Sequence, residues 1–249
     1  MTLTDIWQAM KQSVADGLAA EGILPGGLKI ERKAKMLYHH QDPNEIPQVR
    51  ECRIISSYAF AVSEQNADCG TIVTAPTCGS CGVIPAALLY MQQQRHFTDE
   101  QMLPGLAVAG LIGNLIKHNA SISGAEGGCQ AEVGSASGMA AAALVYVMGG
   151  TPGQMAHACA MALSNTLGLV CDPVAGLVEV PCVKRNVMGA VNALSCAEMA
   201  LAGITSVIPC DEVIDAMRAV GDALPASLRE TGSGGLAATP TGRRLAERL

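Results

Sequence analysis

Three cysteines stand out because each lies next to a glycine or proline break. Cys129 follows two consecutive glycines, Cys171 lies two residues before a proline, and Cys182 directly follows a proline. At such breaks the backbone, more than large side chains, shapes a pocket. Three thiolates are one ligand short of a closed four-ligand site, and an open position is what a metal needs for chemistry. The sequence therefore indicates an incomplete, chemically active metal site.

A second pair, Cys78 and Cys81, has the Cys-x-x-Cys spacing found in redox proteins and in half of a zinc site. The redox interpretation needs a βαβ context and the zinc interpretation needs a second matching pair, and the sequence provides neither. We therefore expect a loop of small residues there. Cys159 and Cys196 lie in apolar helical stretches and are expected to be small buried residues.

Three loops rich in glycine, serine and threonine separate the predicted helices and contain the candidate site residues. They lie near residues 68–82, 119–130 and 168–184. Loops between packed helices are common places for sites, and small hydroxyl residues near a helix start can hold a carboxylate. Apolar periodicity and capping residues predict helices over residues 5–20, 46–65, 85–94, 103–118, 132–147, 151–166, 187–201 and 211–220.

Some of these elements carry more specific expectations. The helix over residues 103–118 is expected to be buried, and Asp211 is expected to cap the last helix. Residues 29–45 are basic and then polar, which favours a solvated connection. The tail over residues 229–242 is too rich in glycine for a helix.

Composition indicates the fold class. Among the 249 residues, 49% are apolar but only 3% are aromatic, and the apolar mass is mostly Ala, Gly, Val, Leu and Met. Alanine favours helix, and small side chains let helices pack closely. We therefore expect an all-α fold, with one compact multi-helix domain over residues 1–249 whose inter-helix loops hold the site.

Charge and hydropathy exclude several classes of partner. The net charge of −6 argues against a nucleic-acid or anionic membrane surface. The longest apolar stretches are shorter than the ~20 residues of a membrane span, and the amino terminus lacks the pattern of a signal peptide. The sequence therefore predicts a cytoplasmic protein. In a reducing cytosol, its ten cysteines suggest metal ligation, catalysis or core packing.

Several long motifs occur in order along the chain: Thr74-Ala-Pro-Thr77, Asn119-Ala-Ser-Ile-Ser-Gly-Ala-Glu-Gly-Gly-Cys-Gln130, Cys171-Asp-Pro-Val-Ala-Gly176, Val180-Pro-Cys182, Arg229-Glu-Thr231 and Gly234-Gly-Leu236. With them, the chain resembles the catalytic (alpha) domain of the iron–sulfur-dependent bacterial L-serine dehydratases from about residue 7 to residue 242. The resemblance implies a [4Fe–4S] cluster held by Cys129, Cys171 and Cys182, with the fourth iron open. It also implies deamination of L-serine to pyruvate and ammonia without pyridoxal phosphate.

An open iron suits this reaction because a Lewis acid makes hydroxide a tolerable leaving group once a base takes the Cα proton. We expect hydrogen bonds to the substrate carboxylate or hydroxyl from a set of polar loop residues: Thr74, Thr77, Asn119, Ser121 and Ser123. Glu126 could pair with the substrate ammonium, and Lys117 could neutralise a carboxylate or an intermediate. For each of these polar residues a local cap or loop hydrogen bond is an equal alternative. Asp172 and Glu179 could orient a cluster loop or take part in catalysis.

The general base is the least defined part of the site. His118 is the histidine nearest in sequence to a site loop, but the family attributes its catalytic histidine to a second, beta domain. No such domain is found in this chain, so we expect a separate beta-type chain to complete an oligomeric enzyme; an alpha-only form and a fragment of a longer chain are the alternatives.

Three other functions are alternatives to this one, and the cysteine spacing argues against the electron-transfer function. A related lyase could act on L-threonine or L-cysteine, because one methylene is worth only ~1–3 kcal/mol in discrimination. An electron-transfer protein normally has four closely spaced cysteine ligands, whereas the spacings here are 42 and 11 residues. A non-catalytic iron–sulfur subunit would take a fourth ligand from Cys78, Cys81 or Cys210.

Overall fold

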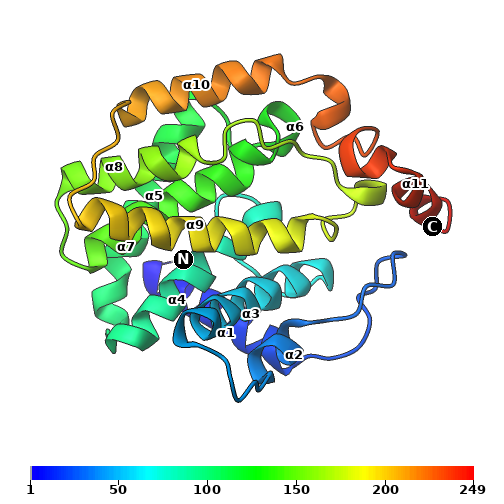
Figure 1. Ribbon diagram of the computed structural model, residues 1–249, viewed down its shortest axis with the longest axis horizontal. Helices are drawn as coiled ribbons and strands as arrows, with labels where there is room; N and C mark the ends of the chain where they lie inside the picture. The colour runs from blue at the N-terminus through cyan, green and yellow to red at the C-terminus, as the bar shows by residue number, and fades with distance from the viewer. Residues whose placement is uncertain (1) are drawn as a thin grey trace.

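In the computed structural model of the protein, which describes residues 2–249, eleven α-helices and several short helical turns make up the fold (Figure 1). The β-bridges found in these residues are isolated and form no sheet. The prediction of an all-α fold is therefore confirmed. No helix within residues 2–249 is both long enough and apolar enough to cross a membrane.

The central element is α7 (Ser135–Val147), whose residues from Ser135 to Val145 are all buried. Eight of its 13 residues are Ala, Gly or Ser and the others are mainly apolar, so neighbouring helices can pack on every side of it. Gly138 shows how close this packing is, because a Cβ there would lie 3.0 Å from the sulfur of Cys159. The helices around α7 are α4 (Val83–Arg95), α5 (Asp99–Asn119), α8 (Pro152–Ser164) and α9 (Cys182–Leu201).

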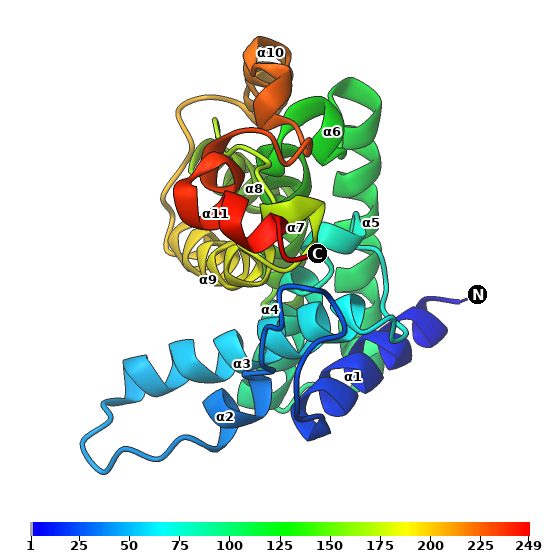
Figure 2. The same ribbon diagram turned by 90° about the vertical axis from the view of Figure 1, so that its right-hand side faces the viewer.

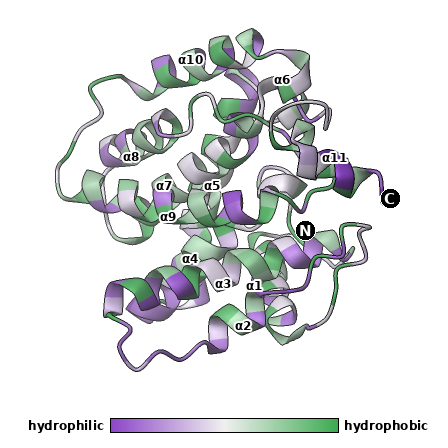
Figure 3. Ribbon diagram, turned by 45° about the vertical axis from the view of Figure 1, so that its right-hand side comes forward, coloured by the Kyte–Doolittle hydropathy of each residue, from purple (hydrophilic) through white to green (hydrophobic). Residues whose placement is uncertain are grey.

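An amino-terminal layer packs against this core and consists of α1 (Leu3–Ala19), α2 (Ala34–His39) and α3 (Pro47–Ala67). Asp99 at the start of α5 joins α1 to the core, since its carboxylate accepts hydrogen bonds from Trp7 (3.1 Å) and Lys11 (2.6 Å). Figure 2 shows α2 and the following connection projecting from the body, and Figure 3 shows that this connection is largely hydrophilic. The expected solvated connection thus contains a short helix, whose Ala34 is fully buried in the hydrophobic core.

Helices α6 (Gly124–Gly127) and α10 (Cys210–Ala223) lie on the side of the molecule opposite the amino-terminal layer, and α11 (Pro240–Ala246) lies at one end, near the carboxyl terminus (Figure 1). The predicted absence of helix in the tail is wrong, because α11 begins inside it. Thr239 caps α11 by accepting a hydrogen bond from the amide of Gly242 at 3.1 Å, and Pro240 occupies the first helical position.

Several helix boundaries and environments also differ from the sequence-based expectations. Helix α9 begins at Cys182, and α10 begins at Cys210 after Pro209, so Asp211 lies inside the first turn and is not the cap. Helix α5 is not buried all round, because Leu111 is 59% exposed and Leu115 is 46% exposed. By contrast, Thr151 caps α8 as predicted, accepting a hydrogen bond from the amide of Gln154.

Candidate active site

Cys129, Cys171 and Cys182 come from three separate segments and are all buried, with exposed fractions of 2%, 3% and 6%. Cys129 directly precedes a π-helical turn over Gln130–Gly134 that leads into α7. Cys171 lies in the connection between α8 and α9, and Cys182 is the first residue of α9. The sulfurs of Cys129 and Cys171 lie within 4.8 Å of each other and of a carboxylate oxygen of Glu132. The structure thus brings two of the three cysteines together with an acidic group.

The segment that carries Cys129 is held by the side chain of Gln130, which is fully buried. Its amide nitrogen donates to the carbonyl of Met217 in α10, and its amide oxygen accepts from the backbone of Gly168, both at 2.9 Å. Gly128 has a φ of +76°, and a Cβ there would lie 2.8 Å from the carbonyl oxygen of Leu169. A glycine is therefore required directly before Cys129.

Cys171 is fixed by the carboxyl-terminal tail. Its backbone amide donates to the carbonyl of Leu228 at 2.9 Å, and its own carbonyl accepts from the amide of Glu230 at 2.8 Å. These two bonds form an isolated parallel bridge between Cys171 and Arg229. The Gly-rich tail thus positions a candidate ligand 58 residues before it.

The guanidinium of Arg185 connects all three cysteine-bearing segments. Arg185 lies on α9 within one turn of Cys182, and one of its nitrogens lies 3.5 Å from the sulfur of Cys129. The same nitrogen donates to the carbonyl of Val170 at 2.8 Å, and the other terminal nitrogen forms an ion pair with Asp172 at 2.8 Å. Asp172 in turn accepts a hydrogen bond from the amide of Leu236 at 2.7 Å.

These neighbours decide which thiol ionises most readily. The pKa of Cys129 is lowered by a hydrogen bond from Cys171 and by the positive charge of Arg185, although burial opposes the shift. The pKa of Cys171 is raised, first by the same thiol pair and then by burial, because a second charge beside Cys129 is unfavourable. Burial and the charges of Cys129 and Glu132 raise the pKa of Cys182 to about 12. A positively charged group among the three sulfurs would stabilise their thiolate forms and so lower these pKa values.

Glu132 is a site residue that the sequence reasoning missed. One carboxylate oxygen accepts a hydrogen bond from the hydroxyl of Thr77 at 2.8 Å, and the other lies 3.9 Å from the sulfur of Cys171. Burial raises the pKa of Glu132, while the bond from Thr77 opposes that shift. The signal that could have found it is its position three residues after Cys129, since residues three apart in a helical turn share a face.

The segment before Cys129 approaches this group through Gly124. A Cβ on Gly124 would lie 2.5 Å from an oxygen of Glu132 and 3.1 Å from the sulfur of Cys171. The backbone of Gly124, which has no side chain, therefore lines this side of the site. Of the predicted substrate-binding residues, Thr77 is the one whose side chain bonds directly to this group among the described residues.

The other predicted polar residues lie elsewhere or at the surface. Thr74, Lys117 and Asn119 are exposed, and the Asn119 side chain donates to the carbonyl of Leu115 at 2.9 Å. Ser121 donates to the carboxylate of Glu126 and accepts from the amide of Ser123 at 3.0 Å. Ser121 and Glu126 line a pocket of about 290 Å³ together with Arg218, Asp222 and Arg229.

The candidates for a fourth ligand or a base are also placed by the structure. Cys78 and His118 are exposed, whereas Cys81 is buried with its sulfur 4.0 Å from the carbonyl of Val62. Cys210 lies in a different pocket beside Cys159. Glu179 is 5% exposed, its Oε2 atom has no hydrogen-bond partner among the described residues, and burial raises its pKa. Cys159 and Cys196 are fully buried, as predicted.

Comparison with known proteins gives a consistent match. The model of the family described as serine dehydratase alpha chain matches residues 1–237. A probable L-serine dehydratase alpha chain of Bacillus subtilis (strain 168) is 63% identical over 193 residues, which are 78% of this chain and 64% of that protein.

Longer relatives match nearly all of the chain. An L-serine dehydratase of Streptomyces coelicolor is 46% identical over 237 residues, covering 94% of this chain and 52% of that protein. L-serine dehydratase 2 of Escherichia coli (strain K12) is 44% identical over 240 residues, covering 94% of this chain and 53% of that protein. The chain thus spans about half the length of these two relatives.

Proposed function

The chain belongs to the serine dehydratase alpha chain family, and from this we propose that it is the iron–sulfur part of an L-serine dehydratase, which deaminates L-serine to pyruvate and ammonia. The observation that supports the proposal is that Cys129, Cys171 and Cys182 are all buried, and that Arg185, three residues after Cys182, contacts the sulfur of Cys129 and pairs with Asp172 beside Cys171. We propose a cytoplasmic, oligomeric enzyme that is completed by a beta-type chain.

The donor set fits a cluster held by three cysteines. All three sulfurs are free thiols, and a guanidinium lies beside one of them. Thiolates are the usual ligands of iron–sulfur clusters, and a guanidinium favours the anionic form of the Cys129 sulfur. We therefore propose Cys129, Cys171 and Cys182 as the ligands of a [4Fe–4S] cluster. When bound, such a cluster supplies a Lewis acid for the substrate hydroxyl.

We propose a substrate group for each polar residue from the chemistry of its side chain. Thr77 is the proposed donor nearest the cysteines, with its hydroxyl oriented by Glu132. Thr74, Asn119, Ser121 and Ser123 remain proposed donors to the carboxylate or hydroxyl. Glu126 remains the proposed partner of the ammonium, and Lys117 the proposed partner of a carboxylate. Ser121 and Glu126 are bonded to each other and line a separate pocket. Their proposed roles therefore require the substrate to reach the segment before Cys129 from this pocket.

The proposal is tested by purifying the chain without oxygen, alone and together with a beta-type chain from the same source. Iron and sulfide per chain are measured, and pyruvate formation from L-serine is followed. We expect about four irons per chain and pyruvate formation once both chains are present. Turnover of L-threonine or L-cysteine in place of L-serine would redirect the substrate assignment. A cluster without turnover of any of the three would favour a non-catalytic subunit.

Cysteine variants test the ligand assignment. Cys171→Ala is expected to lose iron and activity together, because it removes one of three ligands. Cys196→Ala is the matched control, because Cys196 is fully buried and its sulfur contacts Asn165 and Asn192. We expect that variant to keep both iron and activity. Loss of iron from Cys196→Ala, or full iron content in Cys171→Ala, would show that the ligand set is wrong.

A further inference from the structure

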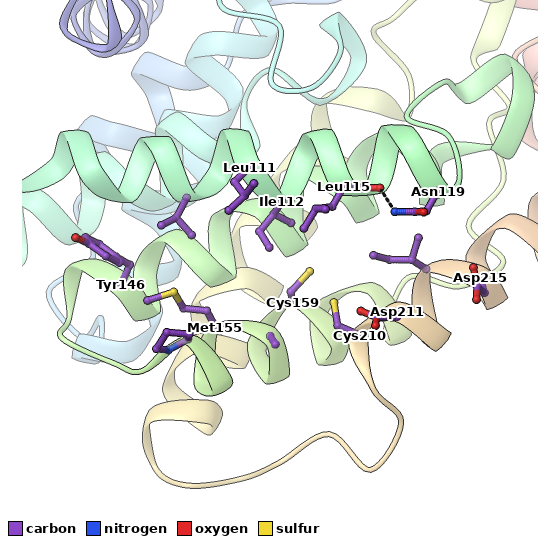
Figure 4. Close-up of a pocket in the computed structure, with 14 residues that line it drawn as sticks. Leu111, Ile112, Leu115, Asn119, Tyr146, Met155, Cys159, Cys210, Asp211 and Asp215 are labelled. Atoms are coloured by element: carbon purple, nitrogen blue, oxygen red, sulfur yellow. Dashed lines mark hydrogen bonds between the residues drawn. The ribbon is translucent and has the colours of Figure 1, made fainter.

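A second pocket, of about 700 Å³, lies away from the three candidate ligands and contains two other cysteines. Its wall is mainly apolar and is built by α5, the start of α8 and the start of α10 (Figure 4). Leu111, Leu115 and Tyr146 on its rim are 59%, 46% and 39% exposed. The pocket is therefore reached directly from solvent.

The two cysteines differ in their access to this pocket. Cys159 lies in α8 and is fully buried, whereas Cys210 is the first residue of α10 and is partly exposed. Figure 4 shows the two side chains next to each other in the wall of the pocket, with both sulfurs on the pocket side. Cys159 and Cys210 also pack in one apolar cluster with Ile214 and Met155.

From this geometry we propose that Cys159 and Cys210 are a redox-active thiol pair, which a low-molecular-weight disulfide or a peroxide converts to an intramolecular disulfide. The partly exposed Cys210 meets the oxidant, and the buried Cys159 completes the bond. This modification site is distinct from the proposed cluster ligands and does not depend on the activity proposed above.

The surroundings of the two thiols support this division of roles. The pKa of Cys210 is lowered by a hydrogen bond from Cys159, although burial and the nearby Asp211 oppose the shift. The free amides at the start of α10 also favour a thiolate at its first residue. The pKa of Cys159 is raised by its contact with Cys210 and by burial. Cys210 is therefore the attacking thiolate and Cys159 the resolving thiol.

With oxidised glutathione as the oxidant, the reaction balances in two exchanges. The Cys210 thiolate attacks one sulfur of the glutathione disulfide, forming a mixed disulfide and releasing one glutathione thiolate. The sulfur of Cys159 then attacks the sulfur of Cys210, displaces the second glutathione thiolate and gives up its proton to a departing thiolate. Two protein thiols are oxidised, and one glutathione disulfide is reduced to two thiols.

The bond would form at a position that matters for the proposed active site. Helix α10 continues from Cys210 to Met217, whose carbonyl accepts the hydrogen bond of Gln130 directly after Cys129. Further along the same helix, Gly221 packs against the backbone of Gly127. A disulfide at the first residue of α10 would therefore tie to α8 the helix that supports the Cys129 segment.

The test uses the protein purified without oxygen, with its iron retained and reductant removed. It is incubated with oxidised glutathione, the remaining thiols are blocked with iodoacetamide under denaturing conditions, and peptides are mapped by mass spectrometry. We expect a cross-linked peptide joining Cys159 to Cys210, and its loss after treatment with dithiothreitol. The control Cys196→Ser should form the same cross-link, because the Cys196 sulfur lies beside Asn165 and Asn192 on another face of the packing and is not a member of the proposed pair.

Two results would overturn the proposal. One is stable glutathione on Cys210 while Cys159 remains free to react with iodoacetamide after unfolding. The other is no oxidation of either residue under conditions in which the exposed Cys52 and Cys69 are oxidised. Both are read from the unmutated protein, so the outcome does not depend on whether a Cys159 variant folds. Cys210→Ser should leave Cys159 unoxidised, which separates the attacking from the resolving residue.

Discussion

At the scale of single residues, Arg185 does most to assemble the candidate active site. Its guanidinium contacts the sulfur of Cys129, the carbonyl of Val170 and the carboxylate of Asp172. Burial alone would lower the pKa of Arg185, but the neighbouring Cys129 and Asp172 raise it. Its planar fork serves three acceptors at once, which the single ammonium of lysine cannot reproduce.

Arg185→Met should therefore destabilise the protein strongly. The change leaves Asp172, whose side chain is 3% exposed, as a buried carboxylate without its cation, and breaking such a pair costs about 3 kcal/mol. Urea unfolding measures this loss. The double variant Arg185→Met with Asp172→Asn should recover part of it, because the buried charge is then removed. Equal stability of the single and double variants would show that the ion pair is not the cause.

At the scale of elements, short helices and turns bring backbone close to the candidate site. Helix α6 is only four residues long, yet it places Gly124 against both Glu132 and Cys171. The π-helical turn after Cys129 directs Glu132 toward Thr77. Such π-turns within helices are frequent at functional sites.

Gly124→Ala tests this close approach. The added Cβ would lie 2.5 Å from the Glu132 carboxylate, so we expect a severalfold loss of iron per chain. Gly110→Ala is the matched control, because Gly110 is exposed in α5 and nothing lies within 4 Å of the added carbon. That change should stabilise the helix by about 0.5–1 kcal/mol with iron content unchanged. Iron content that stays normal in Gly124→Ala would contradict the packing argument.

The contact between α1 and α5 predicts a pH dependence of stability. Hydrogen bonds from Lys11 and then Gln92 lower the pKa of Asp99 from 3.8 to about 2. Because the folded-state pKa is depressed, the stabilisation is present above pH ~4 and is lost as the pH falls toward 2. Asp99→Asn should thus cost about 1 kcal/mol at pH 7, a value reduced for the partial exposure of the pair. The difference from the unmutated protein should shrink by pH 3, as measured by urea unfolding.

The control for this variant is Asp16→Asn on the same helix α1. The side chain of Asp16 accepts a hydrogen bond from Gln12 within that helix and is not linked to α5 among the described residues, so its replacement should change stability little at either pH. A loss for Asp16→Asn equal to that for Asp99→Asn would attribute the effect to helix α1 itself, and not to its contact with α5.

At the scale of the whole molecule, the candidate ligands come from segments that only the complete fold brings together. Cys129 precedes α7, Cys171 is held by the tail at Leu228 and Glu230, and Cys182 begins α9. A metal bound among them would bind the folded chain and not the unfolded chain, so binding would stabilise the fold.

Removal of iron from the anaerobically purified protein by a chelator should therefore lower the thermal unfolding temperature by several degrees. Circular dichroism measures the transition with and without the chelator. Cys171→Ala, which is expected to lack iron, should show no further change when the chelator is added. An unfolding temperature that the chelator does not alter in the iron-containing protein would argue that the cluster does not join these segments.

The sequence by itself determined the features that depend on local interactions. Apolar periodicity and Ala-rich composition predicted the all-α fold. Thr151 could be predicted as the cap of α8 because capping acts within one helical turn. The glycine and proline breaks beside Cys129, Cys171 and Cys182 marked them as special because backbone conformation is local. The tail helix was missed because its Gly-rich start obscured the Thr239-Pro240 signal that begins it.

The tertiary structure decided which polar groups meet. The bond from Thr77 to Glu132 joins residues 55 apart, and the contact of Arg185 with Cys129 joins residues 56 apart. Likewise, the Gly-rich tail reaches Cys171 and Asp172. Spacing along the chain carries no information about such contacts, because they depend on how the helices pack around α7. The motifs could therefore nominate three cysteines, while only the packed helices could show that Glu132 lies against Cys171, that Arg185 lies against Cys129, and that Asp172 pairs with Arg185.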